Sequence, residues 1–209
     1  GGERLELALA RYKALDPDAR IGTLLVNPGG PGFGGTGLAL NAAGIYDTPL
    51  RERFDIVGWD PRGTGDSEPA IDCIDGFDPY FTGVDSTPTD AAEREALAGL
   101  AEDFAAACVE RTPSLTAMGT NSSARDIDAI RRALGEDTIS YFGFSYGSEL
   151  GATWATLFPD TVRAAVLDGA ADPDASMVES SEQQLAGFES TLSTFLAQCS
   201  ADPDCEFHN

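Results

Sequence analysis

The sequence predicts an α/β protein in which a mainly parallel sheet carries helices on both faces. Short apolar segments that suit buried strands alternate with segments of helical spacing along the chain. Three of the apolar segments end in glycine-rich turns, a pattern typical of strand-to-helix connections. Because ligand sites in such sheets form at the carboxyl ends of strands, the three turns are expected to converge.

The predicted strands of the first third of the chain differ in burial. Residues 5–9 alternate leucine with polar or small residues, which indicates a half-buried strand. Residues 21–26 and 54–59 are almost wholly apolar and indicate buried strands. A short helix is expected at 36–43.

The middle of the chain is expected to leave the sheet and return to it. Residues 68–119 form an excursion whose helix presents Cys108 on its buried face. Ser123–Asp126 is a possible capping box, which would start a helix that ends at Gly135. Further on, 162–167 is another buried strand, and helical spacing resumes at Ser176.

The strand predicted at 139–142 runs directly into Gly143–Gly147, which has the pattern G-x-S-x-G. Helical spacing follows from Ser148. A strand that ends at a serine and continues as a helix is a nucleophile elbow, which holds the serine hydroxyl above the sheet. The glycines on either side are needed where strand and helix approach too closely for a side chain. Ser145 is therefore the candidate catalytic residue.

The sequence resembles α/β-hydrolases in three motifs that occur in the same order: Asn27–Gly32 (NPGGPG), Gly58–Ser67 (GWDPRGTGDS) and Gly143–Gly147 (GFSYG). Within that fold it is similar to proline iminopeptidases and to the secreted tripeptidyl aminopeptidases of actinomycetes. The resemblance covers the chain from Leu5 to about Asp174 and includes Leu167–Gly169 (LDG).

This resemblance implies roles for individual residues. Ser145 would be the acylated nucleophile, and the N–H groups of Gly30 and Tyr146 would form the oxyanion hole. Glycine turns and helix N-termini suit this role because their N–H groups are fixed before the reaction. Asp60 and Arg62 are expected to brace the turn after the strand at 54–59.

The resemblance also places a helical lid after the strand at 162–167. Residues 1–175 are thus expected to form the amino-terminal part of the hydrolase core, and residues 176–209 the start of the lid. Acidic groups of the lid would meet the free amino terminus of a peptide substrate. The available residues are Glu179, Glu182 and Glu189, and the substrate-binding residues otherwise stay open.

The Asp and His of the catalytic triad would follow two further strands that this chain does not contain. The only histidine, His208, is expected to be a solvated residue rather than the base. Without the further strands, 162–167 would be an exposed apolar edge. The hypothesis is an amino-terminal piece of a larger hydrolase, inactive alone, to which a second polypeptide or a missing carboxyl-terminal segment supplies Asp and His.

The predicted function is that of a secreted serine aminopeptidase that releases short peptides from free amino termini without a cofactor or metal. The alternatives are a carboxylesterase or lipase-like enzyme, or a peptide-binding module that has lost its triad. Asp-Pro-Asp occurs three times, but the full Asp-x-Asp-x-Asp-Gly calcium loop is absent, so turns are expected.

The composition of the chain indicates which binding partners are disfavoured and in which cellular compartment the protein is expected. Over 209 residues, 35 acidic and 13 basic side chains give a net charge of −22, which disfavours nucleic acid and anionic membranes. No apolar run approaches membrane-spanning length, and no signal peptide is expected within the chain. The four cysteines allow three pairings. Cys199 and Cys205 suit a small loop, which leaves Cys73 with Cys108, and two disulfides favour an exported protein.

Overall fold

The structure is a computed structural model that describes residues 4–170, 172 and 175–207. The chain forms two compact units, Gly1–Ala170 and Ala171–Asn209. The boundary between them lies a few residues before the predicted boundary at residue 175.

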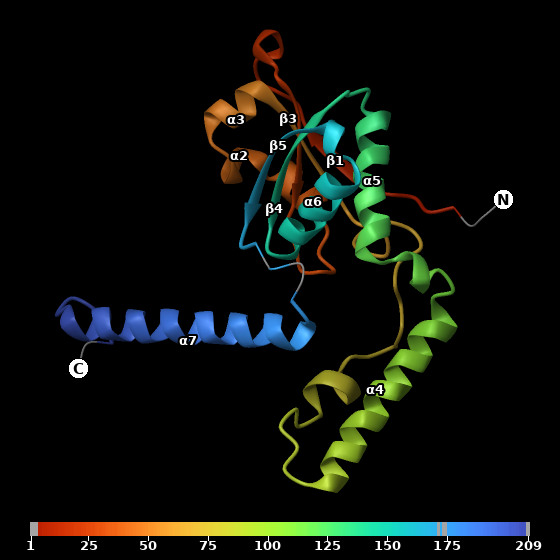
Figure 1. Ribbon diagram of the computed structural model, residues 1–209, viewed down its shortest axis with the longest axis vertical. Helices are drawn as coiled ribbons and strands as arrows, with labels where there is room; N and C mark the ends of the chain where they lie inside the picture. Colours follow the sequence, from red (N-terminus) through yellow and green to blue (C-terminus); the bar gives the residue numbers. More distant parts are fainter. Residues whose placement is uncertain (1–3, 171, 173–174, 208–209) are drawn as a thin grey trace. The chain divides into compact units, whose positions relative to one another are not determined.

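The first unit is built on a five-stranded sheet with the order β1-β3-β2-β4-β5 (Figure 1). Strands β2, β3, β4 and β5 are parallel, and β1 pairs antiparallel with β3. The strands are β1 (Leu9–Tyr12), β2 (Gly22–Asn27), β3 (Phe54–Trp59), β4 (Ile139–Phe144) and β5 (Val162–Asp168). The mainly parallel sheet is therefore confirmed.

Helices cover both faces of this sheet, as predicted. On one face α5 (Thr120–Ala133) and α6 (Tyr146–Leu157) bury a cluster that includes Leu25 and Trp154. The other face carries the chain segment of α1 (Thr36–Leu40), α2 (Ala42–Ile45) and α3 (Thr48–Arg53), and its buried cluster includes Leu24, Val26, Ala42 and Tyr46. Leu24 and Leu25 are adjacent in β2 and lie in opposite clusters, which follows from the alternation of side chains along a strand. Short helical turns lie at η1 (Pro17–Ala19), η2 (Asp78–Thr82), η3 (Leu115–Ala117) and η4 (Pro159–Thr161).

Two predicted elements begin elsewhere in the structure. The first strand spans Leu9–Tyr12 rather than 5–9, because only these residues lie in register with β3, and Glu6 makes an isolated bridge to Glu68. Helix α5 begins at Thr120 with Gly119 as its N-cap, so Ser123–Asp126 lies inside the helix and is not a capping box.

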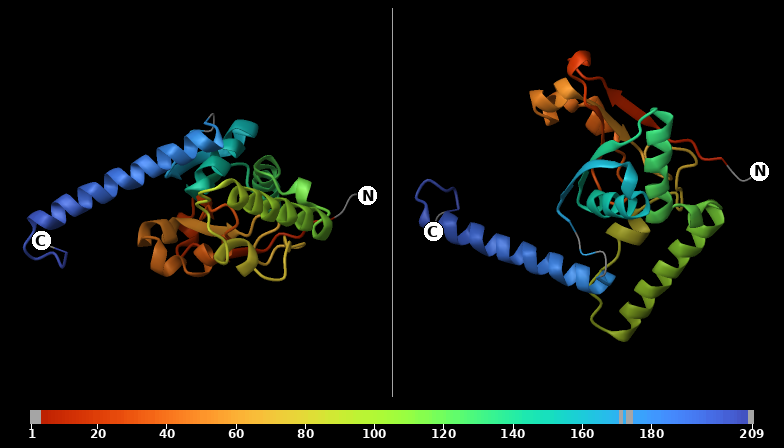
Figure 2. Two further views of the ribbon diagram at one scale, coloured as in Figure 1. Left: turned by 90° about the horizontal axis from the view of Figure 1, so that it is seen from below. Right: turned by 45° about the horizontal axis from the view of Figure 1, so that its top comes forward.

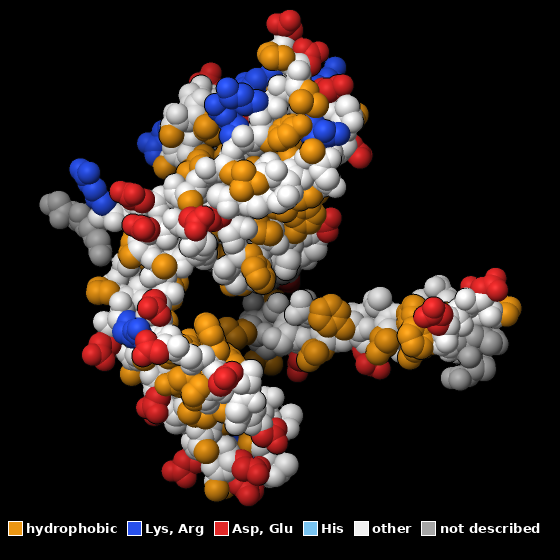
Figure 3. All heavy atoms as spheres, turned by 180° about the vertical axis from the view of Figure 1, so that it is seen from behind, with side chains coloured by type: hydrophobic (Ala, Val, Ile, Leu, Met, Phe, Trp, Pro, Cys, Tyr) orange, Lys and Arg blue, Asp and Glu red, His pale blue; other side chains and the backbone are white. Residues whose placement is uncertain are grey.

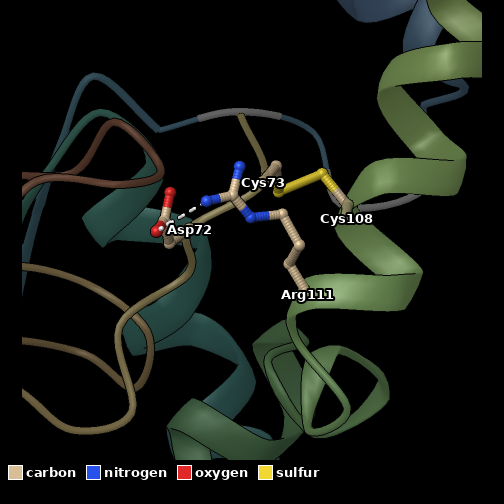
Figure 4. The surroundings of a disulfide bond; sticks show 4 residues. All are labelled: Asp72, Cys73, Cys108 and Arg111. Atoms are coloured by element: carbon tan, nitrogen blue, oxygen red, sulfur yellow. Dashed lines mark hydrogen bonds and ion pairs between the residues drawn. A yellow bond between two sulfur atoms is a disulfide. The ribbon is translucent and has the colours of Figure 1, made fainter. Parts of the chain in front are cut away.

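The excursion between β3 and α5 contains α4 (Ala91–Arg111), whose Cys108 is buried as predicted. A disulfide joins Cys108 to Cys73, and Arg111 on the next turn of the helix forms an ion pair with Asp72 (Figure 4). Arg111 also forms an ion pair with Asp75. The preceding loop is thereby fastened to the carboxyl-terminal end of α4.

The second unit consists mainly of α7 (Met177–Ala201), one continuous helix in every view (Figure 2). Ser176 and Glu179 form a capping box at its start, and a disulfide joins Cys199 to Cys205 after its end. Both predicted cysteine pairs are thus confirmed. Hydrophobic side chains lie on the surface of this helix (Figure 3), and the large exposed ones are Met177, Val178, Leu185, Phe188, Leu192, Phe195 and Leu196. Within the described ranges, no helix combines the length and the hydropathy needed to cross a bilayer.

Candidate active site

Ser145 is the turning point between β4 and α6. Its backbone angles are φ 52° and ψ −124°, and among the described residues it is the only non-glycine with positive φ. Side chains disfavour this region, so the surrounding structure has to hold the residue there. Ser145 is exposed while its neighbours Gly143 and Gly147 are buried. The serine thus stands at the surface of a rigid turn.

The two glycines of the motif are required by backbone packing. A Cβ atom on Gly143 would lie 2.2 Å from the carbonyl oxygen of Gly147. A Cβ atom on Gly147 would lie 2.8 Å from the carbonyl oxygen of Asn27 at the end of β2. Neither position has room for a side chain, as expected for a nucleophile elbow.

Hydrogen bonds fix the elbow from both sides. The Ser145 N–H donates to the carbonyl oxygen of Asp168 at 2.8 Å, which ties the turn to the end of β5. The Ser145 carbonyl accepts from the Ser148 N–H at 2.8 Å and from the Ser148 hydroxyl at 2.6 Å. These bonds use only main-chain atoms of Ser145, and its hydroxyl makes no hydrogen bond to any described residue.

The glycine-rich loop after β2 lies directly against this elbow. A Cβ atom on Gly29 would lie 2.3 Å from the Phe144 carbonyl oxygen and 3.1 Å from both the Ser145 Cβ and the Tyr146 nitrogen. The Gly29 N–H donates to the Asn27 side-chain oxygen at 2.9 Å. It is therefore occupied within the loop.

The N–H groups of Gly30 and Tyr146 differ from that of Gly29, since neither has an acceptor among the residues that the structure describes. Gly30 is exposed, and Tyr146 is the first residue of α6. Unpaired N–H groups at a helix N-terminus attract developing negative charge. Tyr146 directly follows Ser145, and Gly30 directly follows Gly29, which packs against the Ser145 turn.

The Tyr146 side chain is anchored away from its backbone. Its hydroxyl lies 2.8 Å from the hydroxyl of Thr120 at the start of α5. Burial raises the pKa of Tyr146 above its ordinary value, while the bond with Thr120 acts in the opposite direction. Tyr146 therefore stays uncharged near neutral pH. No sequence signal pointed to Thr120, because its partner lies on another helix.

Asp60 braces two loops, as expected from the sequence. It is only 2% exposed, and its carboxylate accepts from the Thr36 N–H at 3.0 Å and from the Asp66 N–H at 2.9 Å. A Cβ atom on Gly34 or Gly65 would overlap this carboxylate. Asp60 thus joins the end of the glycine-rich loop to the turn after β3.

Arg62 makes a different connection. It donates to both carboxylate oxygens of Asp126 at 2.8 and 2.6 Å, and to the carbonyl oxygen of Ala117 at 2.8 Å. Asp126 therefore pairs with this arginine instead of capping a helix. The ion pair fixes the turn after β3 against α5 and the segment before it.

A triad cannot be assembled from the described residues. His208 lies outside them, so its role stays a prediction. The predicted lid acids lie in the second unit, and Glu179 already accepts a bond from the Ser176 N–H at 2.8 Å. The described residues also contain no group of acidic, histidine or cysteine side chains suited to a metal ion.

The parallel sheet, the elbow and the adjoining glycine loop define an α/β-hydrolase. The family model for the alpha/beta hydrolase fold matches residues 22–208, and the chain belongs to this family.

Named relatives are more specific. Serine protease Hip1 of Mycobacterium tuberculosis is 38% identical over 209 residues, which cover 98% of this chain and 39% of that protein. Tripeptidyl aminopeptidase of Streptomyces lividans is 39% identical over 180 residues, 82% of this chain and 33% of that protein. Carboxylesterase B of M. tuberculosis is 43% identical over 213 residues, 98% of this chain and 40% of that protein. The chain thus spans at most 40% of the length of these three relatives.

Proposed function

We propose that this chain is the nucleophile-bearing part of a secreted serine aminopeptidase that releases short peptides from a free amino terminus. One observation carries the proposal: the exposed Ser145 stands on a strained turn against Gly29, and the N–H groups of the next residues, Gly30 and Tyr146, have no acceptor among the described residues. A serine in this setting is suited to attack a carbonyl group.

In the proposed reaction the Ser145 oxygen attacks the scissile carbonyl carbon while its proton passes to a histidine. The carbonyl oxygen becomes an oxyanion that accepts from the N–H groups of Gly30 and Tyr146. Loss of one such donor typically costs about 3 kcal/mol of transition-state stabilisation. The intermediate collapses to an acyl-enzyme as the leaving amine takes the proton from histidine. Water then releases the short peptide by the same steps.

The described residues contain no histidine, so the triad base has to come from elsewhere, and the proposal assigns its aspartate to the same source. Two observations support a further segment or a second polypeptide. The relatives are more than twice as long as their matches to this chain. Strand β5 is an edge of the sheet, and its Val166 and Leu167 are 53% and 38% exposed. An apolar edge of this kind is suited to accept another strand.

The aminopeptidase proposal rests on the names of two relatives, a serine protease and a tripeptidyl aminopeptidase. The strongly negative chain also suits a substrate with a cationic amino terminus. Two disulfides support export. The second candidate is a carboxylesterase, because the relative of that name is 43% identical.

The nucleophile is tested with a fluorophosphonate probe on the complete protein, in which this chain is joined to the segment that supplies Asp and His. The probe is expected to label Ser145, and Ser145→Ala is expected to abolish labelling. Ser86→Ala, at an exposed loop serine, serves as the matched control and should be labelled like the parent. Labelling that survives Ser145→Ala contradicts the assignment, and a parent that is never labelled favours the binding module.

The substrate class is tested with tripeptide anilides that carry a free or a blocked amino terminus, beside p-nitrophenyl esters. An aminopeptidase is expected to cleave the free anilide far faster than the blocked one. Equal rates on both anilides, together with faster ester cleavage, would favour the carboxylesterase.

A further inference from the structure

A cavity opens beside the oxyanion donors. Its volume is about 270 Å³, and it is lined from three sides: by the glycine-rich loop, by the turn after β3 and by the start of α5. Pockets for whole small ligands are usually about 300–1,000 Å³. This cavity therefore has room for part of a peptide rather than for a whole one.

The cavity adjoins the reacting atoms through Gly29 and Tyr146, which both line it. The same two residues flank Ser145, since a Cβ atom on Gly29 would lie 3.1 Å from the Ser145 Cβ. A group that enters the cavity thus lies next to the carbonyl that Ser145 would attack.

The apolar wall of the cavity consists of Ile71 and Met118. Both pack on Gly63, where a Cβ atom would lie 2.6 Å from the Ile71 Cγ1 and 3.2 Å from the Met118 Sδ. The Ile71 N–H donates to the Gly63 carbonyl oxygen at 3.1 Å, which fixes that side of the wall. On the other side, Arg62 binds the carbonyl oxygen of Ala117, next to Met118. The wall is therefore preformed.

The cavity offers no uncompensated charge. Among the described residues that line it, Arg62 alone is charged, and Asp126 neutralises its guanidinium through two hydrogen bonds. The Tyr146 hydroxyl is held by Thr120. A charged side chain placed here would lose its hydration without gaining a partner.

We infer that this cavity is the pocket for the side chain on the acyl side of the scissile bond, and that Met118 and Ile71 select an uncharged side chain by size. The inference rests on the proposed function. When a short peptide is removed from a longer chain, the leaving group is the long remainder and needs an open path. The acyl portion is short and stays bonded to Ser145, so a small pocket next to Tyr146 and Gly29 suits it.

The inference is tested on the complete protein with peptide anilides that differ only in the residue before the anilide: Ala, Leu, Phe or Lys. The parent should favour Leu and Phe over Lys. Met118→Trp fills the cavity and should lower kcat/KM for Leu and Phe relative to Ala by about 10- to 200-fold, the range for misfit in an apolar pocket. Met118→Ala enlarges it and should raise the Phe-to-Leu ratio.

Two controls separate this inference from the proposed function. Val109→Trp introduces the same side chain at an exposed position of α4 outside the cavity, and should leave all ratios unchanged. Fluorophosphonate labelling of Ser145 reports the nucleophile independently of selectivity. If Ser145 is labelled normally and both Met118 variants keep the substrate ratios of the parent, the inference is overturned while the proposed function stands. Absence of labelling in the parent overturns both.

Discussion

Glycine is required around Ser145 because main-chain atoms lie too close for a side chain, and not because the chain has to be flexible there. At Gly29, Gly143 and Gly147 the atoms that exclude a side chain include main-chain carbonyl oxygens. Such atoms cannot rotate away as a side chain would. The geometry of the turn therefore depends on the absence of three Cβ atoms as much as on the presence of a hydroxyl.

Gly29→Ala tests this dependence. Its φ of +91° and the close Phe144 oxygen should displace the loop and with it the Gly30 N–H. Misplacing one oxyanion donor typically costs about 10²- to 10³-fold in kcat, so a loss of that order is expected in the complete protein. Gly37→Ala is the control, because nothing lies within 4 Å of its Cβ position in α1. It should keep full activity and gain up to about 1 kcal/mol of stability. Parental kcat in Gly29→Ala would contradict this account.

At the scale of elements, the turn after β3 is held by charges that belong to different parts of the chain. Arg62 follows β3, and its partner Asp126 lies within α5, 64 residues further along. Their side chains are only 15% and 12% exposed. A pair this deeply buried is most damaging when one member is left alone.

Asp126→Ala should therefore lower the free energy of unfolding by about 3 kcal/mol, because Arg62 loses its partner. The double variant Arg62→Met, Asp126→Leu should lose less, since no buried charge remains. Urea unfolding of the complete protein measures both. The control is Asp75→Ala, which removes a 93% exposed partner of Arg111 and should change stability by less than about 1 kcal/mol. A double variant less stable than Asp126→Ala would refute the explanation.

These elements also show which parts of the fold could be predicted from the sequence alone. Strands β2 to β5 were predictable because each is a mostly apolar run, and Ser145 because its motif joins a strand to a helix. The start of β1 depends on its register with β3, which no local pattern encodes. Asp126 was assigned to a cap because its partner Arg62 lies far away in sequence. The cavity wall of Ile71 and Met118 forms only when two loops meet over Gly63.

At the scale of the whole molecule, the sheet ends in β5, whose outer edge has no partner strand among the described residues. The strand is exposed along most of its length, and its neighbour β4 pairs with it on one side only. An unpaired apolar edge recruits other strands, either those of the complete protein or those of another copy.

The 209-residue chain produced alone is expected to self-associate through β5, and Val166→Lys should shift it toward monomer because a charge disfavours edge pairing. Light scattering coupled to size exclusion measures the change. Val109→Lys, at a site 68% exposed on α4, is the matched control and should have little effect. A chain that stays monomeric without its remaining segment would show that this edge is tolerated.

Because of where the two disulfides lie, oxidation is expected to stabilise some parts of the chain more than others. They close loops of sequence separation 35 and 6, one in the excursion and one at the end of α7, and none of the four cysteines belongs to a strand of the sheet. Thiol reductants should therefore loosen the periphery first, while the turn that carries Ser145 keeps its shape through main-chain contacts. The proposed oxyanion donors, Gly30 and Tyr146, thus lie outside both disulfide loops.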